Sequence, residues 1–223
     1  MSKGKVWLTH SKVGVSKAAD KLREMGYEVF SAPLIEIAPP VNMPSLVQTG
    51  AILIFTSQNG VAAFCGQTDR RGFPVVTVGE ATAHAAREAG FDMVYSANGM
   101  SVDVTQLVIE RFDPGPVIHC SGKSFRGTIV RDLNQAGFSA QRHIYYDQFP
   151  VAFLPRLPGD LTHVMFFSAM ASEAYRKLSP RNSDLIAISI SETVDNALGQ
   201  MSFKERHIAG GPNLTSMLTE LGA

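Results

Sequence analysis

The sequence repeats itself at an offset of about half its own length. Phe55, which ends an apolar run, returns as Phe166 after 111 residues. The segment 78–82, VGEAT, returns as the segment 190–194, ISETV, after 112 residues. The repeats of solenoid proteins run roughly 20 to 50 residues, so each unit of this chain of 223 residues has the size of a domain. We therefore expect two like halves that hold a ligand between them.

Short apolar segments alternate with helical patterns along both halves. This alternation predicts an α/β fold of two similar domains, each with a parallel sheet flanked by helices. A helix is expected over 16–25, and the stretch 27–37 is expected to be extended. The other predicted strands are 6–9, 51–55, 75–78, 93–95, 117–120, 163–167, 185–190 and 206–208. The Pro-rich segments 38–40 and 149–158 interrupt the pattern as linkers do.

Composition excludes several classes of protein. Lys plus Arg equals Asp plus Glu at 20 each, whereas a dedicated nucleic-acid binder needs clustered excess positive charge. Cys65 and Cys120 lack metal or redox spacing, and the N-terminal residues resemble neither a secretory signal nor a membrane span. We expect a cytoplasmic protein that binds neither nucleic acid nor membrane.

The residues that follow the predicted strands are mostly small, hydroxylic or glycine. Ligands of open α/β sheets bind at the carboxyl ends of the strands, and backbone amides at helix starts bind anions there. The same residue types are also ordinary helix N-caps, and that alternative stays open for each single turn. The turns concerned begin at Thr9, Thr56, Gly79, Ser121, Ser168 and Ser191.

Nucleotide and metal motifs are incomplete. Gly122-Lys123-Ser124 follows a strand, but a P-loop needs a glycine five residues before Gly122, where the chain has Val117. No Gly-x-Gly-x-x-Gly follows a predicted strand, and the six histidines show no metal-ligand spacing. The sequence predicts no cofactor and no metal.

Several short motifs together carry a resemblance to a known family. They are Phe55-Thr56-Ser57 with Val61, Gly79 with Thr82-Ala83, 122–126 with Leu133 and Gly137, Pro33-Leu34-Ile35, and Tyr146 at the end of a strand. In order and spacing they resemble the uroporphyrinogen-III synthase family, whose members close a linear tetrapyrrole into a macrocycle. The resemblance spans the whole chain.

The resemblance implies a specific domain arrangement. Domain 1 is formed by both chain ends, residues 1–38 and 151–223, and domain 2, residues 41–148, is inserted between them. The two connecting segments then lie near 38–41 and 148–152. Each domain contains the opening part of one repeat and the remainder of the other.

The resemblance also implies a substrate and roles for residues. The substrate is hydroxymethylbilane, four pyrroles with eight carboxylates, and the enzyme is a monomer that makes transient contact with the preceding enzyme of the pathway. Tyr146 is the expected acid that assists departure of the hydroxyl, and Thr82 acts in the same region. Strand alternation places Tyr145 on the opposite face from Tyr146. The residues expected to bind substrate are Thr9, Ser57, Asn59, Gly122, Lys123, Ser124, Arg126, Ser168, Ala169 and Thr193.

Alternatives remain open at this stage. Tyr146 also fits a packed strand tyrosine, Thr82 a helix-start hydroxyl, and Arg126 a solvated helix arginine. The chain has His10 where the family commonly has arginine, and Val194 where it commonly has threonine. Such departures also fit an inactive, synthase-like regulatory domain. A third possibility is a non-catalytic two-domain protein that binds a small anion.

Overall fold

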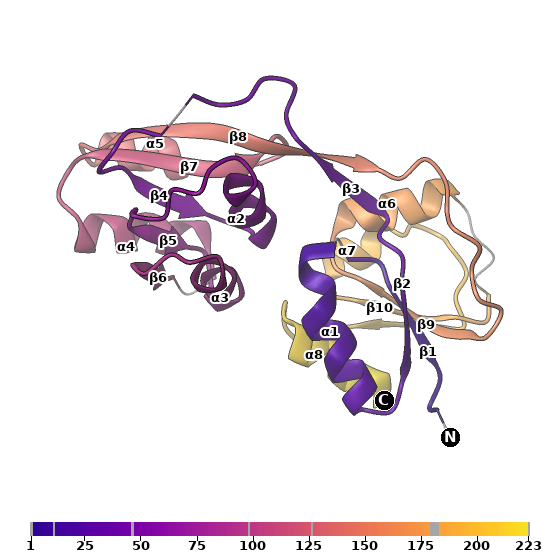
Figure 1. Cartoon of the computed structure of the whole chain (residues 1–223). Helices are drawn as coiled ribbons and strands as arrows, with labels where there is room; N and C mark the ends of the chain where they lie inside the picture. The colour runs from indigo at the N-terminus through magenta and orange to yellow at the C-terminus, as the bar shows by residue number, and fades with distance from the viewer. Residues whose placement is uncertain are drawn as a thin grey trace. The chain divides into compact units, whose positions relative to one another are not determined.

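A computed structural model describes residues 2–10, 12–45, 47–97, 99–125, 127–178 and 183–222 (Figure 1). The chain divides into two compact units. Unit 1 comprises residues 1–36 and 149–223, and unit 2 comprises residues 37–148. Each unit is built on a largely parallel sheet flanked by helices, which confirms the predicted fold class. Within the described residues, no helix has both the length and the apolar character needed to cross a membrane.

The sheet of unit 1 has five strands in the order β11-β10-β9-β1-β2. These are β1 (Lys5–Leu8), β2 (Glu28–Ser31), β9 (Leu161–Phe166), β10 (Ile186–Ser189) and β11 (Glu205–Ile208). Neighbouring strands pair in parallel, for example Val6 with Val29. The helices of this unit are α1 (Lys12–Glu24), α6 (Ala169–Leu178), α7 (Glu192–Asn196) and α8 (Leu214–Thr219), followed by the short 3-10 helix η1 (Glu220–Gly222).

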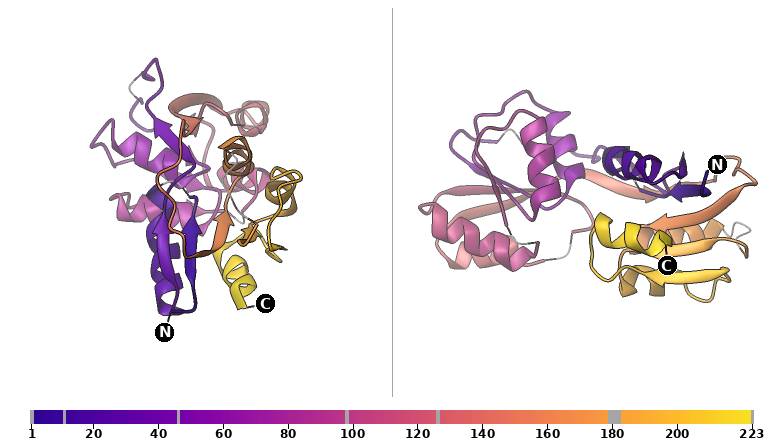
Figure 2. Two further views of the ribbon diagram at one scale, coloured as in Figure 1. Left: turned by 90° about the vertical axis from the view of Figure 1, so that its right-hand side faces the viewer. Right: turned by 90° about the horizontal axis from the view of Figure 1, so that it is seen from below.

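The sheet of unit 2 has six strands in the order β3-β8-β7-β4-β5-β6. These are β3 (Ile35–Ala38), β4 (Ile52–Phe55), β5 (Val75–Thr77), β6 (Val94–Ser96), β7 (Pro116–Gly122) and β8 (Ser139–Pro150). Helices α2 (Gln58–Cys65), α3 (Glu80–Glu88), α4 (Ser101–Arg111) and α5 (Ile129–Gln135) flank this sheet; Figure 2 gives two further views of the ribbon.

The two sheets share one topology, which accounts for the sequence repeat. In unit 1, β1 lies between β9 and β2, and in unit 2, β7 lies between β4 and β8. The turn after α1 and the turn after α5 each contain a glycine with positive φ, Gly26 at 89° and Gly137 at 91°. Such angles favour glycine because it lacks a Cβ. Each unit thus combines the opening strands of one repeat with the later strands of the other.

The central strands of unit 2 are buried on both faces. Leu53 and Phe55 pack into one apolar cluster, and Ile52 and Ile54 pack into another. All four side chains are at most 5% exposed. Alternate residues of a strand face opposite sides of the sheet, so a continuous apolar run is what a strand covered by helices on both sides requires.

Strand β8 differs most from the sequence-based expectation. The residues Phe149 and Pro150 were expected in a linker, yet β8 continues to Pro150. It has β7 and β3 as neighbours in the sheet, and this pairing extends the strand. Pro150 is the last residue of β8, and its lack of an N–H is consistent with the strand ending there. The chain passes from unit 1 to unit 2 within β3, and returns after Gln148 within β8.

A register shift at the end of β7, in its pairing with β8, places two tyrosines together. Ser121 pairs with Ile144, but the next residue, Gly122, pairs with Tyr146, so Tyr145 is the extra residue of a bulge. Tyr145 and Tyr146 both belong to the buried cluster that contains Phe55. The expectation that the two tyrosines lie on opposite faces is therefore wrong, because strict alternation holds only for a regular strand.

Candidate functional site

A pocket of about 270 Å³ lies in unit 2, where several strands end. Ligands of open α/β sheets occupy this edge. The pocket brings together four of the residues predicted from the sequence, Ser57, Gly122, Ser124 and Tyr146. The other lining residues are Thr56, which begins one of the turns indicated by the sequence, and Val78, Ser101, Phe125 and Gln148.

Tyr146 and Ser57 form a hydrogen bond in this pocket. The Tyr146 hydroxyl lies 2.9 Å from Ser57 Oγ. Ser57 is the N-cap of α2, and its Oγ accepts a hydrogen bond from the Gly60 N–H at 3.2 Å. A serine hydroxyl has one proton to donate. With the Gly60 amide already donating to Oγ, Ser57 can give that proton to the Tyr146 oxygen, which leaves the phenol proton of Tyr146 available to a ligand.

Burial keeps the Tyr146 phenol protonated. The side chain is 7% exposed, and this burial raises the pKa of Tyr146 above its usual value of 10.0. The hydrogen bond from Ser57 acts in the opposite direction and lowers the pKa in part. A neutral phenol at physiological pH is a proton donor, so the hydroxyl is in the form that an acid requires.

The Tyr146 ring packs against Gly122, where a side chain would leave no room for it. A Cβ added at Gly122 would lie 2.6 Å from Cε2 of the ring and 2.7 Å from Cζ. No real Cβ contact is that short, so any larger residue at 122 must displace the ring. Gly122 therefore shapes the pocket through packing, in addition to the substrate contact that the sequence predicts for it.

Helix α2 also depends on a close approach, at Gly60. A Cβ at Gly60 would lie 2.9 Å from the carbonyl oxygen of Cys120 in β7. Glycine is used where a helix and a neighbouring backbone meet this closely. The start of α2, with Ser57, is thereby held against the strand that leads to Gly122.

The turn after β7 carries charge beside the pocket. The Lys123 N–H donates to the Tyr146 carbonyl at 2.9 Å, which attaches the turn to β8. The Lys123 ammonium lies 3.2 Å from Asp147 Oδ2, and the lysine side chain is 67% exposed. The Asp147 side chain is only 12% exposed, so the exposed ammonium of Lys123 can contact an anionic ligand while it stays beside this carboxylate.

A buried histidine, which the sequence argument did not single out, lies next to the pocket-lining Thr56. His119 Nε2 lies 3.2 Å from Thr56 Oγ1, and the ring packs edge-on against Phe125 at 4.4 Å between centroids. Burial, followed by the positive charge of Arg142, lowers the pKa of His119 to about 4. Within the described part of the chain, its Nδ1 has no hydrogen-bond partner. His119 is thus a neutral residue near neutral pH.

Among the described residues of unit 2, Asn59 and Thr82 were also predicted but do not line this pocket. Asn59 is half-buried in the first turn of α2. Thr82 is 5% exposed in the first turn of α3, where its backbone N–H donates to Gly79 O. Arg126 lies outside the described residues.

The predicted residues of unit 1 lie at strand ends and helix starts. Thr9 is 1% exposed, and its hydroxyl donates to the Met165 carbonyl at 2.7 Å. Ser168 Oγ accepts from the Ala171 N–H at 3.2 Å, at the start of α6, whose first residue is Ala169. Thr193 is exposed in α7. In this structure the hydroxyls of Thr9 and Ser168 serve the fold.

The segment around Val194 has a structural role of its own. Val194 is 5% exposed in the first turn of α7, and the next residue, Asp195, is 8% exposed. The Asp195 carboxylate accepts from the Arg206 guanidinium at 2.7 and 3.1 Å and from the Ser189 hydroxyl at 3.2 Å. This network links α7 to β10 and β11. The local sequence ISETVD in unit 1 therefore anchors the helix.

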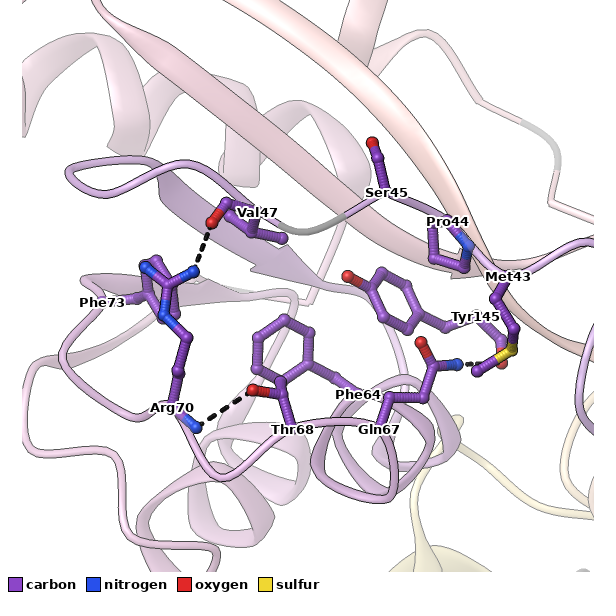
Figure 3. A pocket seen from close by; sticks show the side chains of 10 residues that line it. All are labelled: Met43, Pro44, Ser45, Val47, Phe64, Gln67, Thr68, Arg70, Phe73 and Tyr145. Carbon is purple, nitrogen blue, oxygen red and sulfur yellow. Dashed lines mark hydrogen bonds between the residues drawn. The ribbon is translucent and has the colours of Figure 1, made fainter.

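A second pocket, of about 220 Å³, lies elsewhere in unit 2 (Figure 3). Phe64 of α2 and Tyr145 of β8 face its interior, with ring centroids 5.3 Å apart. Its rim includes Arg70, which donates to the Val47 carbonyl. The lining contains none of the residues predicted for catalysis or binding. The pocket beside Tyr146, which contains four of those residues, is therefore the better candidate for the active site.

Comparison with known proteins agrees with the resemblance seen in the sequence. A family model described as uroporphyrinogen-III synthase HemD matches residues 16–219. A search of curated proteins gave no match. The fold is similar to a uroporphyrinogen-III synthetase from Helicobacter pylori, with a TM-score of 0.64 at 17% identity, covering 99% of this chain and 98% of that one. It is also similar to a mutant uroporphyrinogen III synthase from Thermus thermophilus, with a TM-score of 0.50 at 14% identity, covering 98% and 97%.

Proposed function

The chain belongs to the uroporphyrinogen-III synthase family, and we propose that it converts hydroxymethylbilane into uroporphyrinogen III with loss of water. It acts in tetrapyrrole biosynthesis as a hydro-lyase that also closes a ring. The observation that carries the proposal is the family match over residues 16–219. The pocket beside Tyr146 supports it independently, since it joins a proton donor to groups that suit carboxylates.

The reaction needs orientation more than activation. Hydroxymethylbilane loses its terminal hydroxyl to give an azafulvene, and the substituted carbon of the last ring then attacks it. The resulting spiro intermediate fragments and closes again with that ring inverted, and a proton is lost as the pyrrole recovers its aromaticity. Without enzyme the bilane closes to the uninverted isomer. An enzyme therefore has to hold the reacting carbons in the geometry that leads to the spiro intermediate.

Tyr146 is the residue that we assign to departure of the hydroxyl. Its proton passes to the leaving oxygen as the carbon–oxygen bond breaks, so that water departs and a phenolate remains. The Ser57 hydroxyl, 2.9 Å away, stabilises that phenolate by donating to it. The phenolate is then available to take up the proton that the inverted ring loses, which restores the starting state of the enzyme.

The size of the pocket limits which part of the substrate it receives. Pockets for whole small ligands typically measure roughly 300 to 1,000 Å³, and this one measures about 270 Å³. A chain of four pyrroles with eight carboxylates exceeds that space. We propose that the pocket receives the reacting end of the bilane and that the other rings extend beyond it.

The groups around the pocket can bind a carboxylate even though the protein carries no excess of positive charge. The chain has no formal net charge at pH 7, so affinity for a polyanion has to come from directed donors. Lys123 offers an exposed ammonium, and Ser124 and Ser101 offer hydroxyls. Ser101 is also the first residue of α4, an 11-residue helix whose N-terminus favours negative charge. Phe125 and Val78 supply apolar contacts for a pyrrole ring.

The proposal is tested with purified protein and freshly made hydroxymethylbilane. The products are oxidised to uroporphyrins and the isomers are separated. We expect isomer III with protein and isomer I without it. Protein that binds the bilane yet yields only isomer I would support the alternative of an anion-binding protein, and protein that neither binds nor converts it would support an inactive regulatory domain.

A further inference from the structure

Arg142 of β8 holds the turn that forms one wall of the pocket. Its Nε donates to Ser121 Oγ at 2.7 Å. Its Nη2 donates to two carbonyls, those of Gly122 and Lys123, each at 2.6 Å. The guanidinium carbon also lies 5.6 Å from the centre of the Phe125 ring. One side chain thus contacts the last two residues of β7 and two residues of the turn that follows it.

These contacts determine which way the peptide groups of the turn point. All peptide bonds of the described residues are trans, so each N–H points opposite to the carbonyl of the preceding residue. The Lys123 N–H illustrates this, since it donates to the Tyr146 carbonyl while the Gly122 carbonyl accepts from Arg142. Because Arg142 also binds the Lys123 carbonyl, the Ser124 N–H points away from Arg142.

The Ser124 N–H remains available to a ligand. Ser124 lines the pocket beside Tyr146, and no described residue accepts a hydrogen bond from its amide. The positive charge of Arg142 on the Lys123 carbonyl polarises the peptide group, which makes the amide at its other end a stronger donor. A polarised N–H on a residue that lines a pocket is suited to a carboxylate.

We infer that Arg142 is a positioning residue that directs the Ser124 N–H into the pocket as a binding group for a substrate carboxylate. The inference rests on the proposed function, and it adds a residue and an amide to the proposed site. Arginine suits the task because its planar fork reaches several acceptors at fixed angles. Lysine carries the same charge but cannot hold the two carbonyls and the Ser121 hydroxyl in one arrangement.

The test uses binding of uroporphyrin III, an octacarboxylate, and does not depend on turnover. The affinity is measured by fluorescence titration, and the Ser124 amide is followed by NMR in the full-length protein. We expect the Ser124 amide proton of the unmodified protein to move downfield on binding. In Arg142→Lys the dissociation constant should rise about tenfold, the size expected for loss of a hydrogen bond to a charged group, and the shift should disappear.

Arg71→Lys is the matched control, because Arg71 also donates hydrogen bonds to backbone carbonyls but does not line this pocket. It donates to the carbonyls of Ala89 and Thr68 at 2.7 and 2.6 Å, and its guanidinium carbon lies 5.2 Å from the centre of the Phe91 ring. This variant should keep the affinity and the shift. Melting temperatures are compared so that a folding defect is recognised, and Arg142→Gln provides a second variant without charge.

Two results would overturn the inference. The first is an unmodified protein that does not bind uroporphyrin III, or whose Ser124 amide does not move on binding. The second is an affinity of Arg142→Lys that equals that of Arg71→Lys. A protein that binds through Ser124 but forms no isomer III would uphold this inference and refute the proposed activity, so the two failures are distinguishable.

Discussion

The hydrogen bond between Tyr146 and Ser57 can run in either direction, and the direction in which Ser57 donates is the one that suits an acid. The Gly60 amide donates to Ser57 Oγ, so the serine proton is available for the Tyr146 oxygen. In that direction Ser57 acts on the tyrosine and leaves the phenol proton for the substrate. The carboxylate contact predicted for Ser57 from the sequence remains a proposal, and the structure adds a positioning role beside it.

Substitution of Tyr146 by phenylalanine tests the acid. Tyr146→Phe removes the hydroxyl and almost no volume, so the free energy of unfolding should fall by about 1 kcal/mol for the lost hydrogen bond. The initial rate of isomer III formation should fall roughly 100-fold, as is typical for loss of a positioned acid. Tyr145→Phe is the control, since its ring packs against Phe64 in the other pocket. Wild-type rate and isomer purity in Tyr146→Phe would make Tyr146 a packing residue.

Gly122 offers a test of packing at the same place. In Gly122→Ala the new Cβ would lie 2.6 Å from the Tyr146 ring, so the ring has to move. Overpacking of this kind costs about 1 to 3 kcal/mol, and the displaced hydroxyl should also slow the reaction. The matched control is Gly72→Ala, where an added Cβ has no atom within 4 Å. Equal rates for the two variants would show that the position of the ring is unimportant for catalysis.

At the residue scale, the sequence indicated those site residues that can be recognised from their place next to a predicted strand. Ser57, Gly122 and Ser124 follow strands or end them, and these three line one pocket with Tyr146. Tyr146 was expected at the end of a strand but lies within β8, which continues to Pro150. Arg142 could not be found in this way, because its importance lies in contacts with a turn about 20 residues earlier in the chain.

At the scale of elements, β7 contains a titratable group that links stability to pH. His119 of β7 has a pKa lowered to about 4 by burial, against 6.5 for an exposed histidine. Between these values the unfolded chain binds more protons than the folded one, so the free energy of unfolding falls as the pH falls. Its contribution is fully present above pH 6.5 and is lost progressively toward pH 4.

This linkage predicts a difference between two unfolding profiles. As the pH falls from 6.5 to about 4, the free energy of unfolding of the unmodified protein should fall more steeply than that of His119→Gln. The difference in slope should reach up to about 1.4 kcal/mol per pH unit. The measurement is denaturant unfolding at several pH values. Burial also lowers the pKa values of His143 and His163. Both residues are present in the two proteins, so their contributions cancel when the profiles are compared. Parallel profiles would show that folding leaves the pKa of His119 unchanged.

The elements themselves were predictable where the apolar pattern is strong. Expected strands such as 51–55 and 117–120 correspond to β4 and β7, with small differences at their ends. Strand β8 was recognised only in part, because its early residues are polar and its last is a proline. Its length depends on pairing with neighbouring strands, and its bulge at Tyr145 depends on register. Neither property is local to the sequence of the strand.

At the scale of the whole molecule, the repeat predicted more than any single motif. An offset of 111 to 112 residues implied two like domains, and the two sheets have the same strand order over five strands. The two halves nevertheless differ in local structure. The segment after β5 contributes Val78 to the pocket of unit 2, whereas its counterpart after β10 in unit 1 is anchored by Asp195 and Arg206. A repeat in the sequence predicts that two domains share a fold, but it does not predict where their local structures differ.

The central claim is that this chain directs ring closure toward the inverted isomer. The most direct measurement is the fraction of isomer III formed from a fixed amount of hydroxymethylbilane as the protein concentration is raised. Enzymatic closure competes with spontaneous closure, so the fraction should rise from near zero and saturate close to complete inversion. A fraction that stays at the value found without protein, at every concentration of folded protein, would contradict the account.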